Sequence, residues 1–179
     1  NADFNATLKT LRRLATEPWL HLVLKPHTRE VYAKPAYLRE LDAFPNVEIS
    51  RDVGSVALIS WADAVIIVGS SIALEVLLQK KPHLDPEYLH DNTTVFEEAG
   101  AEWTVHDEEA LVDALKQLSE GQEVPYGEEQ VSKVVTRLIM GGSEERDVLK
   151  PYVTFILGGW RNHPAYDNST HDREGPATS

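Results

Sequence analysis

Hydrophobic and polar positions follow two different periods along the first 120 residues. Helical spacing opens the chain, where Phe4, Leu8, Leu11 and Ala15 fall on one face of a helix. Short β-rich runs then alternate with segments of helical spacing. The strands are expected at 21–25, 47–50, 64–69, 82–85 and 102–106, and the helices between them at 32–44, at 54–62 and from Gly69 to the lysine pair at 80–81. This alternation with short connections predicts an α/β fold, a Rossmann-like doubly wound parallel sheet with helices on both faces.

Two of these elements carry additional signals. The run "AVIIVG" at 64–69 is the most continuous β-branched stretch of the chain, as expected for a strand buried on both faces. Asp107 stands where an N-cap belongs, and Glu108 and Glu109 follow it in the first turn of a further helix. Its apolar face comprises Leu111, Ala114, Leu115 and Leu118. Between these elements, residues 86–95 are expected to be irregular.

The domain organisation follows from the same pattern. Residues 1–120 are expected to form one Rossmann-like domain. Residues 121–160 form a C-terminal helical extension, with one helix marked by Val131, Val134, Val135 and Leu138 and a last one at 145–158. Residues 161–179 have too little apolar content to pack and are predicted to be a disordered tail.

Composition and charge narrow the functional classes. A formal net charge of −12 argues against non-specific binding to nucleic acid or anionic lipid, so any phosphate must be held locally. Cysteine is absent, which excludes disulfides and thiolate metal sites and fits a reducing compartment. The sequence has no run of about 18 apolar residues and no secretory leader. We therefore expect a soluble protein in the cytoplasm. A peripheral position at the inner face of the membrane is compatible with this expectation.

The turn after the 64–69 strand is the first candidate site, because ligands of such sheets bind at the carboxyl ends of the strands. Gly69 permits a tight bend, and Ser70 or Ser71 can cap the following helix. The free N–H groups and positive dipole end of that helix would attract a phosphate. An ordinary serine cap with nothing bound is the alternative interpretation.

Glu75 lies one turn beyond Ser71 on the same helical face, amid apolar neighbours. A carboxylate in such surroundings needs a hydrogen-bonding partner, and the diol of a ribose is one. A lysine or arginine of the fold, or simple exposure at the helix end, would satisfy it equally well.

The sequence "LKPHTRE" at 24–30 places His27 and Arg29 at the same sheet edge. Arginine can bind a phosphate through two hydrogen bonds, and histidine can donate a hydrogen bond or exchange a proton near neutral pH. Both residues can also be ordinary surface residues of a loop.

A third stretch, residues 83–98, is rich in polar side chains. Its His83, Asp85, His90 and Asp91 match no standard zinc spacing, so no metal site is predicted. The polar side chains that can contact a base, sugar or phosphate, or instead hold the loop's own backbone, are Tyr88, Asn92, Thr93 and Thr94. The sequence contains no G-x-S-x-G elbow, Walker loop, G-x-G-x-x-G fingerprint or C-x-x-C motif, which removes the commonest hydrolase, NTPase and redox interpretations.

The stretches "LKPHTRE", "ADAVIIVGSSIALEVLLQKKPHLDP" and "FEEAGAEWTVHDEEALVDAL" together resemble the C-terminal, nucleotide-sugar-binding half of GT-B glycosyltransferases. The nearest likeness is to bacterial capsule-type and other surface-polysaccharide enzymes, with the UDP-N-acetylglucosamine 2-epimerases as structural cousins. It spans roughly residues 20 to 120. The most specific part is the strand, the Gly-Ser-Ser turn, the glutamate-bearing helix and the Lys-Pro pair.

The resemblance implies a donor-binding role for the candidate residues. His27 and Glu75 are the candidate catalytic residues, and the nucleotide-sugar donor would contact Arg29, Gly69, Ser70, Ser71, Glu75, Asn92, Thr93 and Thr94. The nucleotide sugar is a substrate, and no cofactor is predicted. Transfer would depend on stabilising the nucleotide leaving group by the helix dipole and by cations.

The sequence departs from the family in two respects. Such enzymes have a second Rossmann-like domain on the amino side, which carries the acceptor site for a glycan or lipid-linked glycan, whereas this chain starts at a helix. We therefore expect activity to require such an N-terminal domain. His83 also follows Pro82 where the family often has a small or apolar residue. A nucleotide-sugar 2-epimerase-like half and a non-catalytic binding module on the same fold are the alternative functions.

Overall fold

The computed structural model of the protein describes residues 3–26 and 36–139. Its contacts divide the chain into a first compact unit that ends at Val134 and a second that begins at Val135. The fold described below is that of the first unit. The predicted helix at 145–158 and the predicted tail at 161–179 lie outside the described residues, as do His27 and Arg29.

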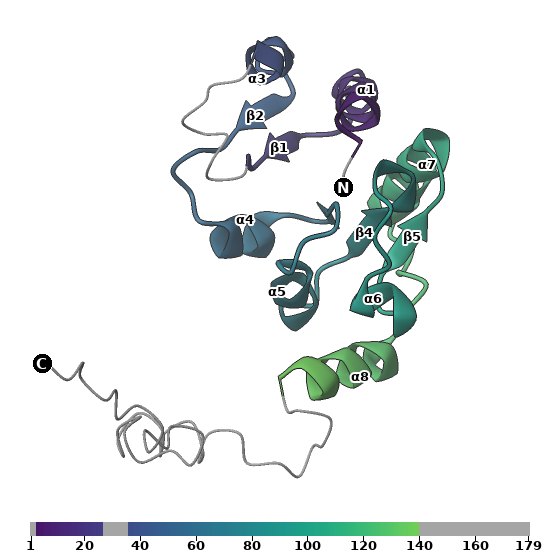
Figure 1. Cartoon of the computed structure of the whole chain (residues 1–179). Helices are drawn as coiled ribbons and strands as arrows, with labels where there is room; N and C mark the ends of the chain where they lie inside the picture. The colour runs from purple at the N-terminus through teal and green to yellow at the C-terminus, as the bar shows by residue number, and fades with distance from the viewer. Residues whose placement is uncertain (1–2, 27–35, 140–179) are drawn as a thin grey trace, which may run out of the picture. The chain divides into compact units, whose positions relative to one another are not determined.

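The strands form two parallel sheets (Figure 1). In the first, β1 (Leu22–Leu24) pairs with β2 (Val47–Ile49). In the second, β4 (His83–Pro86) lies between β3 (Val65–Ile66) and β5 (Trp103–Val105). Every predicted strand is present, and all observed pairs are parallel, which confirms the predicted α/β class. The β3 strand is shorter than its apolar run, although the backbone N–H of Ile67 still donates to the carbonyl of Leu84 (3.1 Å).

Helices separate the strands along the chain, as the pattern predicts. They are α1 (Phe4–Ala15), α3 (Ala36–Leu41), α4 (Ser55–Trp61), α5 (Ala73–Leu78), α6 (Val95–Glu98), α7 (Glu108–Ser119) and α8 (Glu128–Leu138). A 3₁₀ turn, η1 (Glu87–Leu89), lies within the stretch expected to be irregular. The sequence pattern missed η1 and α6 because three or four residues are too few to establish a period.

One face of the three-stranded sheet packs against α1 and α7. Side chains alternate along β4, so Leu84 points to this face while His83 and Asp85 point to the other. The buried residues here are Leu14, Leu84, Val105, Leu111, Val112, Ala114 and Leu115. The start of α7 is fixed as predicted, because the Asp107 carboxylate accepts a hydrogen bond from the backbone N–H of Ala110 (2.8 Å).

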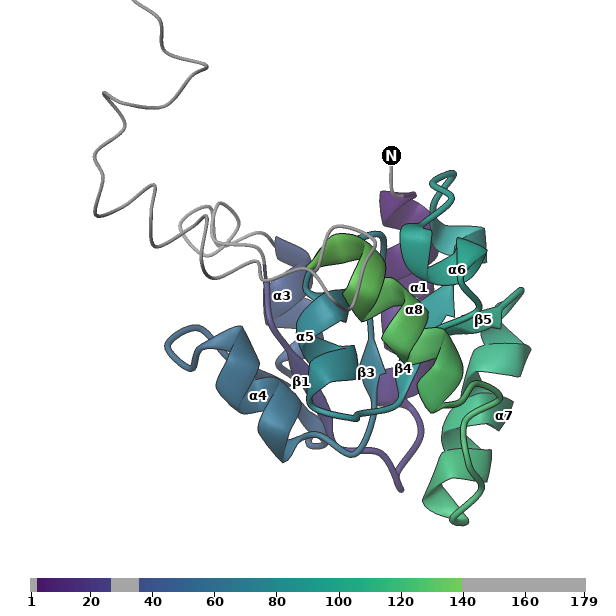
Figure 2. The same cartoon turned by 90° about the horizontal axis from the view of Figure 1, so that it is seen from below.

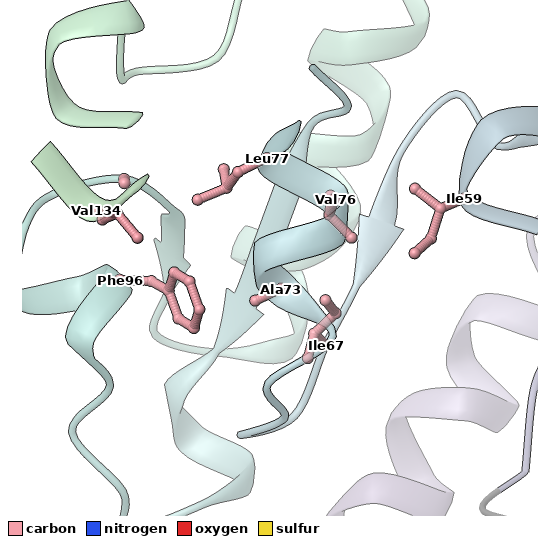
Figure 3. Close-up of a cluster of buried hydrophobic side chains, with 8 residues drawn as sticks. Ile59, Ile67, Ala73, Val76, Leu77, Phe96 and Val134 are labelled. Carbon is pink, nitrogen blue, oxygen red and sulfur yellow. The ribbon is translucent and has the colours of Figure 1, made fainter. Parts of the chain in front are cut away.

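The opposite face is covered by α5, α6 and α8. Figure 2 shows α5 and α8 in front of β3 and β4. Figure 3 shows the side chains that meet there, with Val76 and Leu77 from α5, Phe96 from α6 and Val134 from α8. Both faces of the sheet therefore carry helices, which confirms the doubly wound arrangement. Because Val134 is completely buried in this cluster, the compact unit extends past residue 120, where the sequence pattern placed a boundary.

The two-stranded sheet has its own small core beneath α1 and α3. Its buried residues are Ala15, Leu38, Leu41, Val47 and Ile49. Arg12 of α1 donates two hydrogen bonds to the carboxylate of Glu40 in α3 (2.6 and 2.8 Å), which joins the two helices. Leu22 of β1 contacts both this core and the α1–α7 core, so the two sheets share a continuous apolar interior. Within the described ranges, no helix combines the length and the apolar character needed to cross a membrane.

Candidate functional site

The turn after β3 has the geometry that the sequence predicts for Gly69. The φ angle of Gly69 is 57°, in the left-handed region that favours glycine. Ser70 and Ser71 follow it and are exposed. The turn lies beyond the carboxyl end of β3, where parallel sheets bind ligands.

The prediction that a serine caps the next helix is wrong. Helix α5 begins at Ala73 with Ile72 as its N-cap, and no side-chain hydrogen bond caps it. Ser70 and Ser71 contribute backbone carbonyls instead, which accept from the N–H groups of Ala73 and Leu74 (3.2 Å each). The turn that begins at Gly69 continues through Ile72, so the helix starts two residues after Ser71. Neither serine hydroxyl is therefore used to start the helix.

The backbone N–H groups of this turn are also available. Within residues 3–26 and 36–139, none of the N–H groups at positions 69–72 donates a hydrogen bond to another backbone group. Successive N–H groups in a turn form a concave site for an anion. The anion-binding potential here comes from these groups more than from the dipole of α5, which has only six residues.

Glu75 lies one turn further along, within α5. Its neighbours Ala73, Val76 and Leu77 are buried, and Glu75 itself is half-buried. Among the described residues, no lysine or arginine forms an ion pair with its carboxylate. The interpretation in which an internal cation neutralises Glu75 therefore has no support in this part of the chain.

The loop that follows β4 lies against the Gly69 turn. A Cβ atom placed on Gly69 would be 3.1 Å from Nδ2 of Asn92 and 4.0 Å from Cγ of His90. Two stretches separated by more than 20 residues in the sequence thus meet at one sheet edge. Asn92 and Thr93 are exposed there, and both stay predicted ligand contacts.

Thr94 differs from its two neighbours. Its hydroxyl accepts a hydrogen bond from the backbone N–H of Glu97 (2.9 Å) and thereby caps α6. It also donates to the carboxylate of Glu102, with both oxygens at 3.2 Å. The hydroxyl of Thr94 is therefore occupied within the fold, which leaves Asn92 and Thr93 as the better candidates for contact with a ligand.

Beneath this edge lies a buried pair. The Nε2 atom of His90 is 2.9 and 3.1 Å from the two carboxylate oxygens of Asp85, and both side chains are at most 2% exposed. The Nδ1 atom of His90 accepts a hydrogen bond from the backbone N–H of Asn92 (3.2 Å). Since Nδ1 accepts a hydrogen bond, the imidazole carries its proton on Nε2, and this N–H group donates a hydrogen bond to Asp85.

A second buried carboxylate adjoins Asp85. Burial, followed by the nearby negative charge of Asp85, raises the pKa of Glu102 to about 8, and burial likewise raises the pKa of Asp85. The protonated Glu102 side chain donates a hydrogen bond to Asp85. At neutral pH Glu102 is therefore mostly in its protonated form.

His83 completes the buried group without joining its hydrogen bonds. Neither ring nitrogen has a hydrogen-bond partner in the described part of the chain, and burial lowers the pKa of the imidazole to about 4. Its Nδ1 atom lies 3.8 Å from Glu102, and its ring meets Phe96 edge to face with centroids 6.0 Å apart. His83 is therefore a neutral core residue. Among residues 3–26 and 36–139, no group of three potential ligands could hold a metal ion.

Sequence reasoning considered His83, Asp85 and His90 only as metal ligands, predicted no metal site, and did not single out Glu102. Asp85, His83 and His90 lie in one polar stretch, whereas Glu102 comes from the residue before β5. Glu102 could have been noticed as an acidic residue directly before a strand of β-branched and aromatic residues, where a charged side chain is rarely buried without a partner. Only the register of β4 and β5, which the sequence does not reveal, brings Glu102 beside His83 and Asp85.

The site thus has two layers. An exposed layer combines the Gly69 turn with Asn92 and Thr93, and offers N–H groups, hydroxyls and an amide to a ligand. A buried layer of carboxyl and imidazole groups supports it from beneath.

In comparisons with known proteins, no family model, no curated protein and no solved structure matches this chain.

Proposed function

We propose that this chain contains the nucleotide-sugar-binding half of a GT-B-type glycosyltransferase acting in surface polysaccharide biosynthesis. The observation that carries the proposal is the meeting of the Gly69 turn and Asn92 beyond the carboxyl ends of β3 and β4. Sheets of this class bind nucleotides at that edge. The resemblance of residues 20–120 to the donor half of these enzymes agrees with this location.

Each part of a nucleotide diphosphate has a chemically suitable partner in the proposed complex. The diphosphate lies over the N–H groups of residues 69–72 and the hydroxyls of Ser70 and Ser71, which are exposed donors. The ribose diol donates to the carboxylate of Glu75, one turn along α5. Asn92 and Thr93 border the same turn and contact the nucleotide or its sugar. Arg29 and His27 supply the cation and the proton-exchanging group near the phosphates.

The reaction is a group transfer. The bond between the anomeric carbon of the sugar and the phosphate oxygen breaks, and a bond from an acceptor hydroxyl oxygen to that carbon forms. The acceptor proton passes to a base, and the electron pair leaves with the nucleotide. The donor half contributes by stabilising negative charge on the departing phosphate. The acceptor, a glycan or lipid-linked glycan, binds a second Rossmann-like domain on the amino side, and the reaction takes place in the cytoplasm.

The proposal is tested by measuring nucleotide binding to the purified chain. Isothermal titration calorimetry with UDP, CDP, CMP and GDP is expected to reveal binding of at least one nucleotide. Glu75→Gln and Arg29→Ala are each expected to weaken that binding by about 1.5 to 3 kcal/mol, as for other hydrogen bonds to charged groups. Asp113→Asn, a change of one exposed carboxylate on α7, is the matched control and is expected to leave the affinity unchanged.

The outcome also decides between the donor-binding role and the alternatives. No binding of any of the four nucleotides would favour a non-catalytic module on the same fold. Binding that is unaffected by both Glu75→Gln and Arg29→Ala would refute the assigned site while leaving a nucleotide-binding function in place.

A further inference from the structure

His90 occupies an unusual place between the sheet and the candidate site. Its side chain is 1% exposed, yet it belongs to the loop that borders the exposed Gly69 turn. Its partner Asp85 lies within β4, which is paired on both sides and so is among the least mobile parts of the sheet. The imidazole therefore connects a fixed strand to a surface loop.

The two ring nitrogens of His90 have separate tasks. Nε2 donates to Asp85, with both carboxylate oxygens within 3.1 Å, which fixes the orientation of the ring and its tautomer. Nδ1 then faces the loop as an acceptor and receives the backbone N–H of Asn92 (3.2 Å). A carboxylate that fixes a histidine so that its second nitrogen can act elsewhere is a recurring supporting arrangement in functional sites.

The position of Asn92 matters because the loop is close to Gly69. A Cβ atom on Gly69 would be only 3.1 Å from Nδ2 of Asn92, which is tighter than most contacts of real Cβ atoms. Because Gly69 has no side chain, Asn92 can come this close. The hydrogen bond from the backbone N–H of Asn92 to His90 then holds it there. The Gly69 turn and the loop that carries Asn92 therefore lie against each other.

We propose that His90 is a positioning residue that holds the backbone of Asn92, through Nδ1, against the Gly69 turn so that both turns present their polar groups to one nucleotide. This inference rests on the proposed function and extends it, because it assigns affinity for the nucleotide to a buried side chain that never touches it. Orienting a loop before binding increases affinity by reducing the ordering that binding must otherwise supply.

Two variants separate the tasks of the ring nitrogens. In His90→Gln, the side-chain amide N–H can replace Nε2 as donor to Asp85, but no acceptor remains at the Nδ1 position. In His90→Asn, the amide oxygen can replace Nδ1 as acceptor for Asn92, but the donor to Asp85 is lost. Val112→Ala shortens a buried side chain on the opposite face of the sheet and serves as a control for a general loss of stability.

Three measurements on the full chain test the positioning role. Nitrogen-15 spectra of the imidazole are expected to show a protonated Nε2 and an unprotonated Nδ1 in the unaltered protein. The amide hydrogen of Asn92 is expected to exchange about tenfold faster in His90→Gln, and the dissociation constant for the nucleotide that binds best among UDP, CDP, CMP and GDP should rise about fivefold to tenfold, the value of one lost hydrogen bond. His90→Asn should restore both values toward those of the unaltered protein.

The results distinguish the inference from the proposed function. If no nucleotide binds the unaltered protein, the proposed function fails, and the exchange rate of the Asn92 amide still decides the positioning role. An imidazole protonated on Nδ1, or an Asn92 amide that stays equally protected in His90→Gln, would overturn the inference. An equal loss of affinity in His90→Gln and Val112→Ala would also overturn it, because the effect would then be general destabilisation.

Discussion

Asp85 and His90 form a buried pair in which one imidazole nitrogen, Nε2, contacts both oxygens of one carboxylate, at 2.9 and 3.1 Å. Four residues lie between them in the sequence, and the pair joins β4 to the loop beside the Gly69 turn. Glu102 donates a further hydrogen bond to the same carboxylate. Asp85 is thus the common acceptor of the buried layer, and its removal would leave two donors without a partner.

Asp85→Ala is therefore expected to destabilise the protein strongly. Breaking a buried pair by removing one partner typically costs about 3 to 5 kcal/mol, because the remaining polar groups stay desolvated. Urea denaturation measures the change in the free energy of unfolding. Asp113→Ala, which removes an exposed carboxylate, is the control and is expected to change the free energy by less than about 0.5 kcal/mol. A loss below about 1 kcal/mol in Asp85→Ala would show that the pair contributes little.

The raised pKa of Glu102 predicts a contribution to the free energy of unfolding that falls as the pH rises from about 4.5 to about 8. Its ordinary pKa of 4.5 is raised to about 8 in the folded state. Between these values the folded state binds one more proton than the unfolded state, so this contribution is fully present below pH 4.5 and is lost as the pH rises through about 8. The slope approaches about 1.4 kcal/mol per pH unit at most.

Glu102→Gln isolates this contribution, because glutamine can still donate a hydrogen bond to Asp85 but does not titrate. The free energy of unfolding, measured by urea denaturation from pH 5 to 8, should decline less steeply in Glu102→Gln than in the unaltered protein. Identical slopes in the two proteins would show that Glu102 ionises normally.

The strands and the longer helices could be predicted from the sequence because their periods extend over enough residues. In α1, Leu8, Leu11 and Ala15 are at least partly buried, as their spacing predicts. Phe4, at the first position of the same helix, is 54% exposed, so the buried part of this face does not extend to the start of the helix. Periodicity thus located the helix but not the limit of its contact.

The sequence named the residues of the exposed layer but not how they meet, and it missed Glu102 in the buried layer. Gly69 was predicted as the tight bend because a positive φ angle favours glycine, and its φ of 57° agrees. The contact between Gly69 and Asn92 depends on how the loop after β4 folds back, which no local pattern encodes. The role of Ser71 was mispredicted because serine is a common cap and the sequence does not show where a turn ends and a helix begins.

His83→Phe is expected to stabilise the protein, most clearly in acid. Both ring nitrogens of His83 are buried without a partner in the described part of the chain, so an apolar ring of similar shape removes a desolvation cost of about 1 to 3 kcal/mol. It also keeps the aromatic contact with Phe96. The variant should therefore unfold at a higher urea concentration than the unaltered protein at pH 7.

The acid dependence of the same variant gives a second test. The pKa of His83 falls from 6.5 to about 4 on folding, so its contribution to stability is present above pH 6.5 and is lost as the pH falls through about 4. Since phenylalanine does not titrate, His83→Phe should lose less stability than the unaltered protein between pH 7 and 4. Equal losses would mean that the imidazole ionises in the folded state as it does in water.

Gly69→Ala and Gly121→Ala separate backbone strain from the contact that shapes the site. Both glycines have positive φ angles, 57° and 86°, so alanine at either position is expected to cost about 1 to 2 kcal/mol of stability. A Cβ atom would meet nothing within 4 Å at Gly121, but at Gly69 it would lie 3.1 Å from Asn92. Only Gly69→Ala must therefore displace the loop beside the turn.

Calorimetric titration with the bound nucleotide should give an affinity at least fivefold weaker for Gly69→Ala, the value of about one hydrogen bond, and an unchanged affinity for Gly121→Ala. If both variants lose stability equally and both bind as the unaltered protein does, the approach of Asn92 to Gly69 has no part in binding.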